Sequence, residues 1–252
     1  MKVSIVTTCL NRVNTIGKAI ESVLAQDFPD IEYIVIDGGS TDGSLDVIRR
    51  YADHLAVLKS EPDSGMYEAI NKGIRLATGE VVGLVHSDDE LYDRHVLSDV
   101  VSRLQHSGAD MVYGNGVYLR DGHVVRNWVS GPVCRWKLRM GWLPLHPTCY
   151  IRRTAIERWG LYDEQYHIAA DTELLLRYLY RARIPAVYMP RYIVRMSMGG
   201  LSTSSRRRHE MWREDVAVYR SMGLPGRMMK IMKMAWKIPQ FITMRKQDET
   251  DC

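Results

Sequence analysis

The sequence predicts an α/β protein whose mixed, mainly parallel central sheet is flanked by helices. The main evidence is a repeated pattern in the first third of the chain. Short apolar runs rich in β-branched residues occur at 2–7, 31–36 and 81–85, and each stops at polar or glycine residues, as strands do. Between the runs, apolar residues recur with helical spacing. Strands that alternate with helices in this way form parallel sheets, and 252 residues suffice for one large domain with an appendage.

The first strand, at 2–7, is predicted to lead into a helix. Ile16, Ala19 and Val23 share one face of that helix, so this face should pack on the sheet. Asn11 lies on the connecting loop, which follows the carboxyl end of the strand. Ligands of open α/β sheets bind at those ends, so the loop is a candidate binding element.

The second strand, at 31–36, ends in the glycine-rich segment 37–43. Its glycines permit positive φ angles and therefore a tight turn. Asp37 stands where the strand ends, which makes it a candidate ligand-binding carboxylate. The alternative is that Asp37 only forms the turn, as Asp does ahead of glycines.

The third unit is a polar turn at 60–65 that runs into a helix predicted at 66–77 and ended by the residues up to Gly79. Asp63 lies in the turn. It is a candidate ligand contact, or alternatively the N-cap of the helix.

The apolar run at 81–85 ends in His86, Ser87, Asp88 and Asp89. Two adjacent carboxylates repel each other, and a hard cation such as Mg²⁺ or Mn²⁺ would compensate them, because it prefers oxygen ligands. The alternative is that both aspartates cap a helix predicted at 91–105.

These segments, taken in order, resemble the inverting family 2 glycosyltransferases of GT-A fold. Within that family they are most similar to bacterial enzymes that build surface polysaccharides and glycolipids, the colanic-acid type among them. Segments 146–153, 169–177 and 199–202 continue the resemblance, which covers about residues 2–202.

The resemblance implies a nucleotide-sugar donor, with UDP expected as the carrier, and a divalent metal, Mn²⁺ or Mg²⁺. Asp89 would lie closest to the metal. The spacing departs from the usual Asp-x-Asp, and His86 replaces a more usual Asn, so the separate roles of the two aspartates stay open. The implied nucleotide-binding residues are Thr7, Asn11, Asp37, Asp63 and Asp88.

Asp171 is the predicted general base, because it matches the position that inverting relatives use. It would stand in the first turn of a helix that opens at 169–170. The alternative is a helix-start residue without chemistry, and Glu173 is the fallback base. His146, Gly200 and Arg206 are further candidates for contacts to the acceptor or the diphosphate. Alternatively, His146 is only a structural histidine, and Gly200 and Arg206 belong to an exposed linker.

The last 50 residues are predicted as a basic helical extension, 203–252, after a domain at 1–202. That domain divides into a nucleotide-sugar half, about 1–110, and an acceptor half, about 111–202. Residues 203–246 hold eleven Lys or Arg against three Asp or Glu, although the whole chain has a net charge of only +4. Lysines and apolar residues within 225–246 alternate as in a basic helix on an anionic membrane surface. Alternatively, its methionines pack on the domain and its lysines face solvent.

Other classes of protein lack support in the sequence. No Gly-x-Gly-x-x-Gly follows an early strand, as a dinucleotide oxidoreductase requires, and no zinc-finger or RNA-binding motif is present, so no nucleic-acid partner is expected. No N-terminal segment has the pattern of a signal peptide. We therefore expect a cytoplasmic enzyme, peripheral on the cytoplasmic face of the inner membrane if the tail binds lipid.

The expected function is glycosyl transfer to a saccharide or a lipid-linked acceptor, in bacterial polysaccharide or glycolipid biosynthesis. A single displacement would invert the anomeric centre. The alternative is a non-catalytic scaffold or carbohydrate-binding protein of the same fold, because fold and function are separable.

Overall fold

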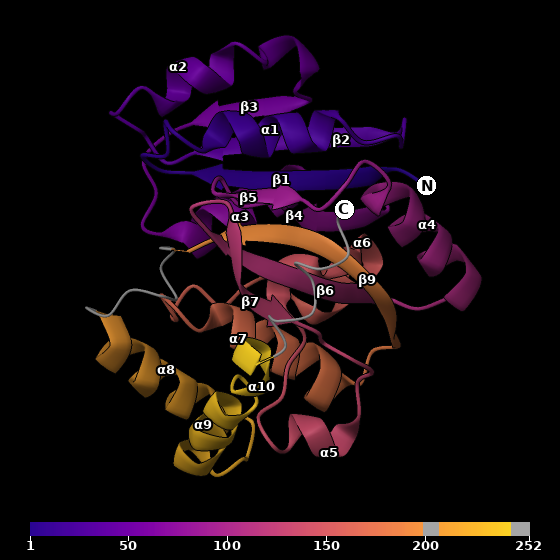
Figure 1. Ribbon diagram of the computed structural model, residues 1–252, viewed down its shortest axis with the longest axis vertical. Helices are drawn as coiled ribbons and strands as arrows, with labels where there is room; N and C mark the ends of the chain where they lie inside the picture. The colour runs from indigo at the N-terminus through magenta and orange to yellow at the C-terminus, as the bar shows by residue number, and fades with distance from the viewer. Residues whose placement is uncertain (199–206, 243–252) are drawn as a thin grey trace.

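A curled sheet of nine strands organises residues 1–198 and 207–242, which are the residues that this computed structural model describes (Figure 1). Its order is β3-β2-β1-β4-β8-β6-β9-β5, and β7 pairs with β6. The predicted mixed α/β class is confirmed. The strands are β1 (Val3–Cys9), β2 (Ile31–Asp37), β3 (Val57–Ser60), β4 (Val81–Leu84), β5 (Asp89–Leu91), β6 (Met111–Arg120), β7 (His123–Trp128), β8 (Tyr150–Arg152) and β9 (Ala186–Ser197).

The first four strands are parallel, and their register aligns the ends that carry the predicted polar residues. Cys9 lies opposite Asp37, and Asp37 lies opposite Ser60. The second half of the sheet is mostly antiparallel: β8 pairs antiparallel with β4 and β6, whereas β9 runs parallel to β6. The loops after β1, β2 and β4 therefore meet at one edge of the sheet.

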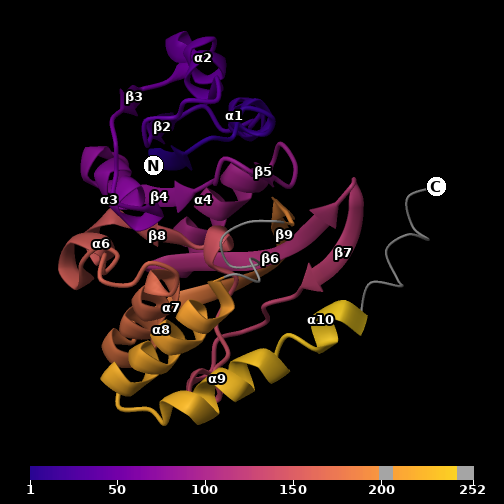
Figure 2. The same cartoon turned by 90° about the vertical axis from the view of Figure 1, so that its left-hand side faces the viewer.

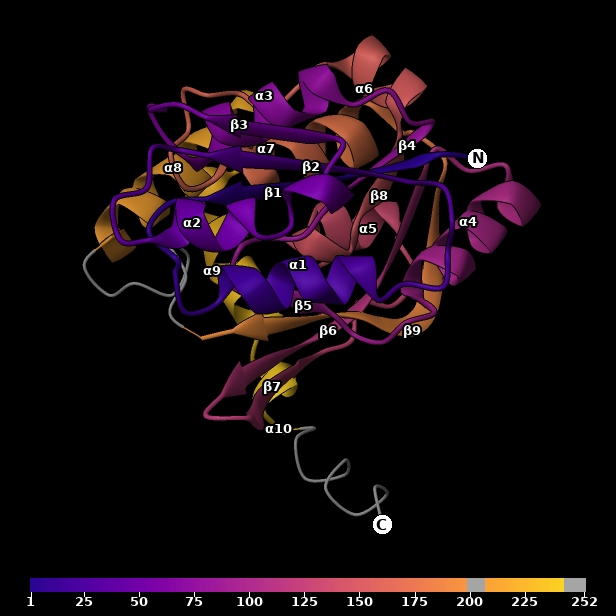
Figure 3. The same cartoon turned by 90° about the horizontal axis from the view of Figure 1, so that it is seen from above.

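Helices cover both faces of the sheet (Figure 3). Neighbouring residues of a strand point to opposite faces. Accordingly, Ile5 packs in the cluster that includes α1 and α4, whereas Val6 packs in the cluster that includes α3 and α7. The helices are α1 (Ile16–Leu24), α2 (Ser44–Arg49), η1 (Ala52–His54), α3 (Met66–Leu76), α4 (Val96–Ser107), α5 (Arg135–Leu138), η2 (His146–Thr148), α6 (Arg153–Trp159), α7 (Ala170–Leu176), η3 (Arg177–Ala182), α8 (Arg208–Ser221), α9 (Gly226–Ala235) and α10 (Pro239–Ile242).

The helix predicted at 91–105 begins later than expected, at Val96. Residues 89–91 instead form β5, in which Asp89 pairs with Met196 of β9. The backbone of this segment therefore pairs with β9 and cannot form a helix at the same time. His95, not an aspartate of the Asp88–Asp89 pair, is the residue that precedes the helix. The helix-capping interpretation of that pair is wrong.

Helices α8, α9 and α10 lie along one side of the domain, with α10 beside β7 (Figure 2). Val218 and Tyr219 of α8 and Met229 of α9 belong to the same buried cluster as α7. The helical part of the tail breaks between α9 and α10, where Pro239 has no N–H to continue the first helix. These helices share the core of the domain, and the boundary expected at 202 and 203 stays a prediction.

The prediction that the tail lysines face outward is wrong for three of them, Lys230, Lys233 and Lys237. Lys230 and Lys233 point inward and pair with Asp215 of α8. The outward face is apolar instead; we call it the outer stripe, and its side chains are 52–60% exposed: Met228, Ile231, Met234, Ile238 and Phe241. Within the described residues, no helix combines the length and the apolar character needed to cross a bilayer.

Candidate active site

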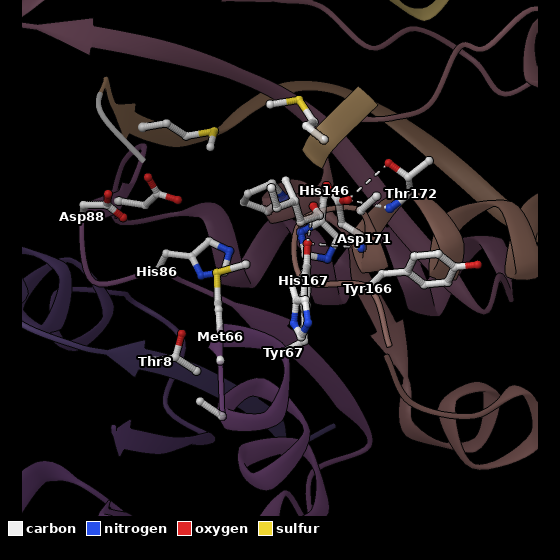
Figure 4. A pocket seen from close by; sticks show the side chains of 18 of the residues that line it. Thr8, Met66, Tyr67, His86, Asp88, His146, Tyr166, His167, Asp171 and Thr172 are labelled. Carbon is white, nitrogen blue, oxygen red and sulfur yellow. Dashed lines mark hydrogen bonds between the residues drawn. The ribbon is translucent and has the colours of Figure 1, made fainter. Parts of the chain in front are cut away.

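A cavity of about 640 Å³ opens at the edge of the sheet where the loops after β1 and β4 meet. Its walls come from both predicted halves of the domain and from α8 and α9. Figure 4 shows Thr8, His86 and Asp88 on one side of it and Asp171 on the other. Of the predicted site residues, the structure brings Asp63, Asp88, Asp89, His146 and Asp171 to this cavity.

Asp37 is completely buried at the end of β2. Its carboxylate accepts hydrogen bonds from the backbone N–H groups of Gly39 and Ser40, at 3.2 and 3.1 Å, and from the Ser60 hydroxyl at 2.6 Å. The carboxylate thus closes the glycine-rich turn and does not line the cavity. A role against the nucleobase stays a prediction for this residue.

Asp63 lines the cavity and lies against the same turn. Burial raises the pKa of its carboxyl group, although Gly65 N–H donates to Oδ1 at 3.0 Å. A Cβ atom at Gly38 would lie only 2.4 Å from Asp63 Oδ2, so the turn after β2 and the turn before α3 approach each other through a glycine. Asp37 and Asp63, two of the three carboxylates predicted to bind the nucleotide, are therefore on touching loops. Gly65, rather than Asp63, precedes the first residue of α3.

The loop after β1 presents residues other than those predicted. Thr7 is completely buried, and its hydroxyl is 3.1 Å from the Tyr33 hydroxyl, so it faces the core. Thr8 and Arg12 line the cavity instead. Neighbouring residues of a strand point to opposite faces. A shift of one residue, from Thr7 to Thr8, therefore moves the side chain from the core to the cavity. Asn11 has a positive φ of 53° and bridges to the turn after β2 through Thr41 N–H, 2.9 Å from Asn11 Oδ1, without lining the cavity.

Asp88 and Asp89 have different environments. Asp88 is partly exposed, with the Arg12 guanidinium 4.0 Å from Oδ2, whereas Asp89 is only 2% exposed. Burial and the adjacent Asp88 raise the pKa of Asp89 well above its ordinary value. Asp89 Oδ2 has no hydrogen-bond partner in the described part of the chain. A buried carboxylate oxygen without a donor fits a cation ligand, because a cation would supply the missing positive charge.

No group of three or more His, Cys, Asp or Glu side chains within 1–198 and 207–242 is arranged to hold a metal ion. Mg²⁺ does not require such a cage: it is often held by one or two carboxylates together with substrate phosphates. Asp88 and Asp89 fit that kind of site.

His86 and His146 stand side by side on the cavity wall, with ring centroids 6.3 Å apart. His146 Nε2 is 2.6 Å from the Tyr162 hydroxyl. Burial lowers the pKa of His146 to about 4, so its imidazole is neutral at pH 7. His146 can therefore offer a hydrogen bond to a ligand but not a positive charge.

Asp171 lies in the first turn of α7, as expected, and lines the cavity. Oδ1 accepts hydrogen bonds from the backbone and the hydroxyl of Thr172, at 2.6 and 3.2 Å. The Tyr67 hydroxyl lies 3.4 Å from the Asp171 backbone nitrogen and donates to the Ile168 carbonyl at 2.8 Å. This tyrosine of α3 therefore ties the start of α7 to the nucleotide half of the domain.

Glu173, the fallback base, is not on the cavity wall. It is 7% exposed, and both of its carboxylate oxygens bind the Arg177 guanidinium at 2.8 Å. Two residues separate 200° on a helix of 3.6 residues per turn, so Asp171 and Glu173 cannot share a face. The fallback assignment is wrong.

Sequence reasoning missed Glu214 of α8. Its carboxylate accepts the backbone N–H groups of His167, Ile168 and Ala169, at 3.0, 2.8 and 2.9 Å. These three residues immediately precede α7, so Glu214 holds the start of this helix, which carries Asp171, in place. A lone glutamate on a polar helix gives no local signal of such a role.

Two further predicted residues, Gly200 and Arg206, lie outside the described residues. Arg207, next in the chain, lines the cavity and pairs with Glu210 at 2.8 Å. Three tryptophans of the segment 128–142 lie in different environments: Trp128 lines the cavity, Trp142 is 6% exposed in the core, and Trp136 is 58% exposed.

Known proteins share both the sequence pattern and the fold. The family model described as Glycosyl transferase family 2 matches residues 4–166. A PGL/p-HBAD biosynthesis glycosyltransferase of Mycobacterium tuberculosis is 29% identical over 206 residues, which are 80% of this chain and 79% of that protein. An uncharacterized glycosyltransferase of the same species is 32% identical over 180 residues, 69% of this chain and 68% of that protein.

Two solved structures have a similar fold. Staphylococcus aureus TarS 1-349 in complex with UDP-GlcNAc matches with a TM-score of 0.68 at 19% identity. The match covers 98% of this chain and 74% of the TarS chain. The mannosyltransferase PcManGT from Pyrobaculum calidifontis, in complex with GDP-Man and Mn²⁺, has a TM-score of 0.67 at 18% identity, with 96% and 73% covered. At these identities the likeness establishes the fold alone.

Proposed function

Because this chain belongs to glycosyl transferase family 2, and is thus an enzyme that uses a nucleotide-sugar donor, we propose that it moves a sugar from UDP to an acceptor hydroxyl with inversion. The acceptor would be a saccharide or a lipid-linked saccharide of bacterial polysaccharide or glycolipid synthesis. The observation that carries the proposal is one cavity that holds Asp171 on one wall and Asp63, Asp88 and Asp89 on the other. UDP is favoured by the UDP-GlcNAc complex of TarS.

Asp171 would act as general base. The acceptor hydroxyl gives its proton to the Asp171 carboxylate while its oxygen attacks the anomeric carbon from the face opposite the nucleotide. The bond between that carbon and the diphosphate oxygen breaks, and the nucleoside diphosphate leaves. The Thr172 bonds to Oδ1 and the Tyr67 contact to the backbone orient this carboxylate.

The donor would lie along the edge of the parallel strands. Asp63, Thr8 and Arg12 line that part of the cavity, and Asp37 and Asn11 support the loops beneath it. Asp89, with Asp88 beside it, would hold a divalent cation, Mn²⁺ or Mg²⁺, which stabilises negative charge on a departing diphosphate. The PcManGT complex with Mn²⁺ supports this assignment.

The outer stripe would place the enzyme at an anionic membrane surface. Five half-exposed apolar side chains in one row are unusual on a surface that only faces water. Trp136 extends the apolar area, since its ring lies 6.2 Å from that of Trp236. Three exposed arginines lie on the same elements: Arg135 on α5, Arg139 directly after α5, and Arg227 on α9. Apolar insertion with arginines against lipid phosphates is how interfacial helices bind. The cytoplasmic face of the inner membrane is the proposed location.

Calorimetry with UDP, GDP, dTDP and CMP, with and without Mg²⁺ or Mn²⁺, tests the donor site. We expect metal-dependent binding of UDP that is lost in Asp89→Asn and retained in Asp53→Asn, a control at an exposed aspartate of η1. If the folded protein binds no nucleotide under any metal condition, the donor site is wrong, and a non-catalytic scaffold of the same fold explains the chain better.

A further inference from the structure

Four cations lie near one another on the α9 and β7 side of the cavity, and two of them, Lys233 and Lys237, line it. We call them the cationic cluster: Arg126 of β7, Lys230 and Lys233 of α9, and Lys237 just after α9. Only Asp215 of α8 pairs with any of them in the part of the chain that the structure describes. It binds Lys230 Nζ and Lys233 Nζ, the latter at 2.8 Å. One carboxylate thus compensates two lysines and leaves the other two cations without an anion.

Arg126 is buried, and no acidic side chain among residues 1–198 and 207–242 pairs with it. Its side chain donates to Gln240 Oε1, from Nε at 2.7 Å, and this amide oxygen is neutral. The guanidinium carbon lies 4.7 Å from the ring centroid of Tyr118 and 4.6 Å from that of Trp128. The aromatic faces stabilise the cation only partly, because they carry no net charge.

Lys237 has no hydrogen-bond or ion-pair partner for its ammonium group among residues 1–198 and 207–242. It nevertheless lies on the cavity wall. Burial, with repulsion from Lys233 and Arg126, lowers the pKa of Lys237 to about 7. Unpaired cations in a partly buried site are costly, and a bound anion would remove that cost.

The cluster lies on the base's side of the cavity. Lys233 Nζ donates to Thr172 Oγ1 at 2.7 Å, and Thr172 is the neighbour of Asp171. Tyr118 and Trp128 line the same cavity and offer flat apolar surfaces. The carboxylates Asp63, Asp88 and Asp89, by contrast, lie on the donor side, in the turn before α3 and at the start of β5. An anion at the cluster would therefore be part of the acceptor rather than of the nucleotide.

We propose that Lys237, supported by Lys233 and Arg126, forms a subsite for a phosphate group carried by the acceptor. The inference rests on the proposed function, since it assumes that the cavity holds donor and acceptor together. A phosphate suits several cations better than a carboxylate does, because it presents more acceptor oxygens and a more concentrated charge. The phosphate would come either from a lipid carrier or from a water-soluble phosphorylated saccharide.

Calorimetry on the full chain saturated with UDP and Mg²⁺ tests the subsite. The probes are hexyl phosphate and glucose 1-phosphate, with hexanoate and glucuronate as carboxylate counterparts. We expect both phosphates to bind and the carboxylates to bind at least tenfold more weakly. Stronger binding of hexyl phosphate would identify a lipid phosphate, and stronger binding of glucose 1-phosphate a soluble one; both outcomes support the subsite.

Lys237→Gln keeps the length of the side chain and removes its charge. Loss of one charge-assisted hydrogen bond should weaken phosphate binding about 10- to 100-fold. Lys18→Gln, at an exposed lysine of α1, is the matched control and should change nothing. UDP binding must persist in both variants. If UDP binds but phosphate does not, or if Lys237→Gln binds phosphate as wild type does, the subsite is wrong while the glycosyltransferase proposal stands. If UDP itself fails to bind, the proposed function is what fails.

Discussion

Removal of the Glu214 side chain should disturb the start of α7, which carries the proposed base Asp171, without preventing UDP binding. Glu214 accepts three backbone N–H groups just before α7, and α7 begins at Ala170 and carries Asp171. In Glu214→Ala these donors lose their common acceptor, and the segment that orients Asp171 is free to shift.

The structure allows an estimate of the cost. The bonds to Ile168 and Ala169 are partly buried and the bond to His167 is exposed, so water can replace the last one. At about 1 kcal/mol for each partly buried bond, the free energy of unfolding should fall by about 2 kcal/mol. For a chain of this length, that lowers Tm by about 4–8 °C. A shift of the base by about 1 Å would lower kcat about 100-fold.

The assay combines thermal unfolding, UDP calorimetry and the rate of UDP release from the donor. Glu157→Ala is the matched control, because Glu157 is 55% exposed and pairs with Arg153 on the surface of α6. It should stay within about 0.5 kcal/mol of wild type. An unchanged Tm and an unchanged kcat in Glu214→Ala would refute the positioning role. A loss of UDP affinity would show instead that the variant disturbs the whole domain.

Three other predictions concern chemistry, pH and location. Asp171→Asn should bind UDP like wild type yet lose turnover about 100- to 10,000-fold, as expected for a missing general base; near-normal turnover would exclude Asp171 from that role. Because Lys237 has a pKa of about 7, its charge is present below that pH and lost above it. Affinity for a dialkyl phosphate, whose own charge stays constant, should therefore fall as pH rises through neutrality in wild type but not in Lys237→Gln, and equal pH dependence in both would contradict this. Replacing Ile231 and Met234 by Ser should weaken co-sedimentation with anionic vesicles by about 1–2 kcal/mol per side chain, whereas unchanged sedimentation would leave the outer stripe without a membrane role.

Local patterns predicted three of the nine strands of the described sheet, and the first helices. The strands at 3–9, 31–37 and 81–84 agree with the predicted runs to within a few residues, and α3 begins at Met66 as expected. These elements were readable because β-branched runs and helical spacing are properties of neighbouring residues. For the same reason the sequence placed Asp171 in the first turn of a helix.

The errors arose where one segment depends on a distant one. Residues 89–91 form a strand because β9, more than 100 positions later, lies beside them. Thr8 lines the cavity in place of Thr7, because the Thr7 side chain packs in the core beside Tyr33 of β2. Neither partner is visible in the local pattern.

The sequence by itself therefore determined the α/β class, the order of strands and helices in the first third and the carboxylates at the strand ends, because these follow from local periodicity and turn chemistry. Only the tertiary structure decided that α8 supports α7 through Glu214, and that the lysines of α9 turn inward while Met228, Ile231 and Met234 face outward. The physical reason is that a helical pattern shows two faces but not which one meets the domain. Asp215 of α8, buried between α8 and α9, pairs with Lys230 and thereby turns the lysines of α9 toward the domain.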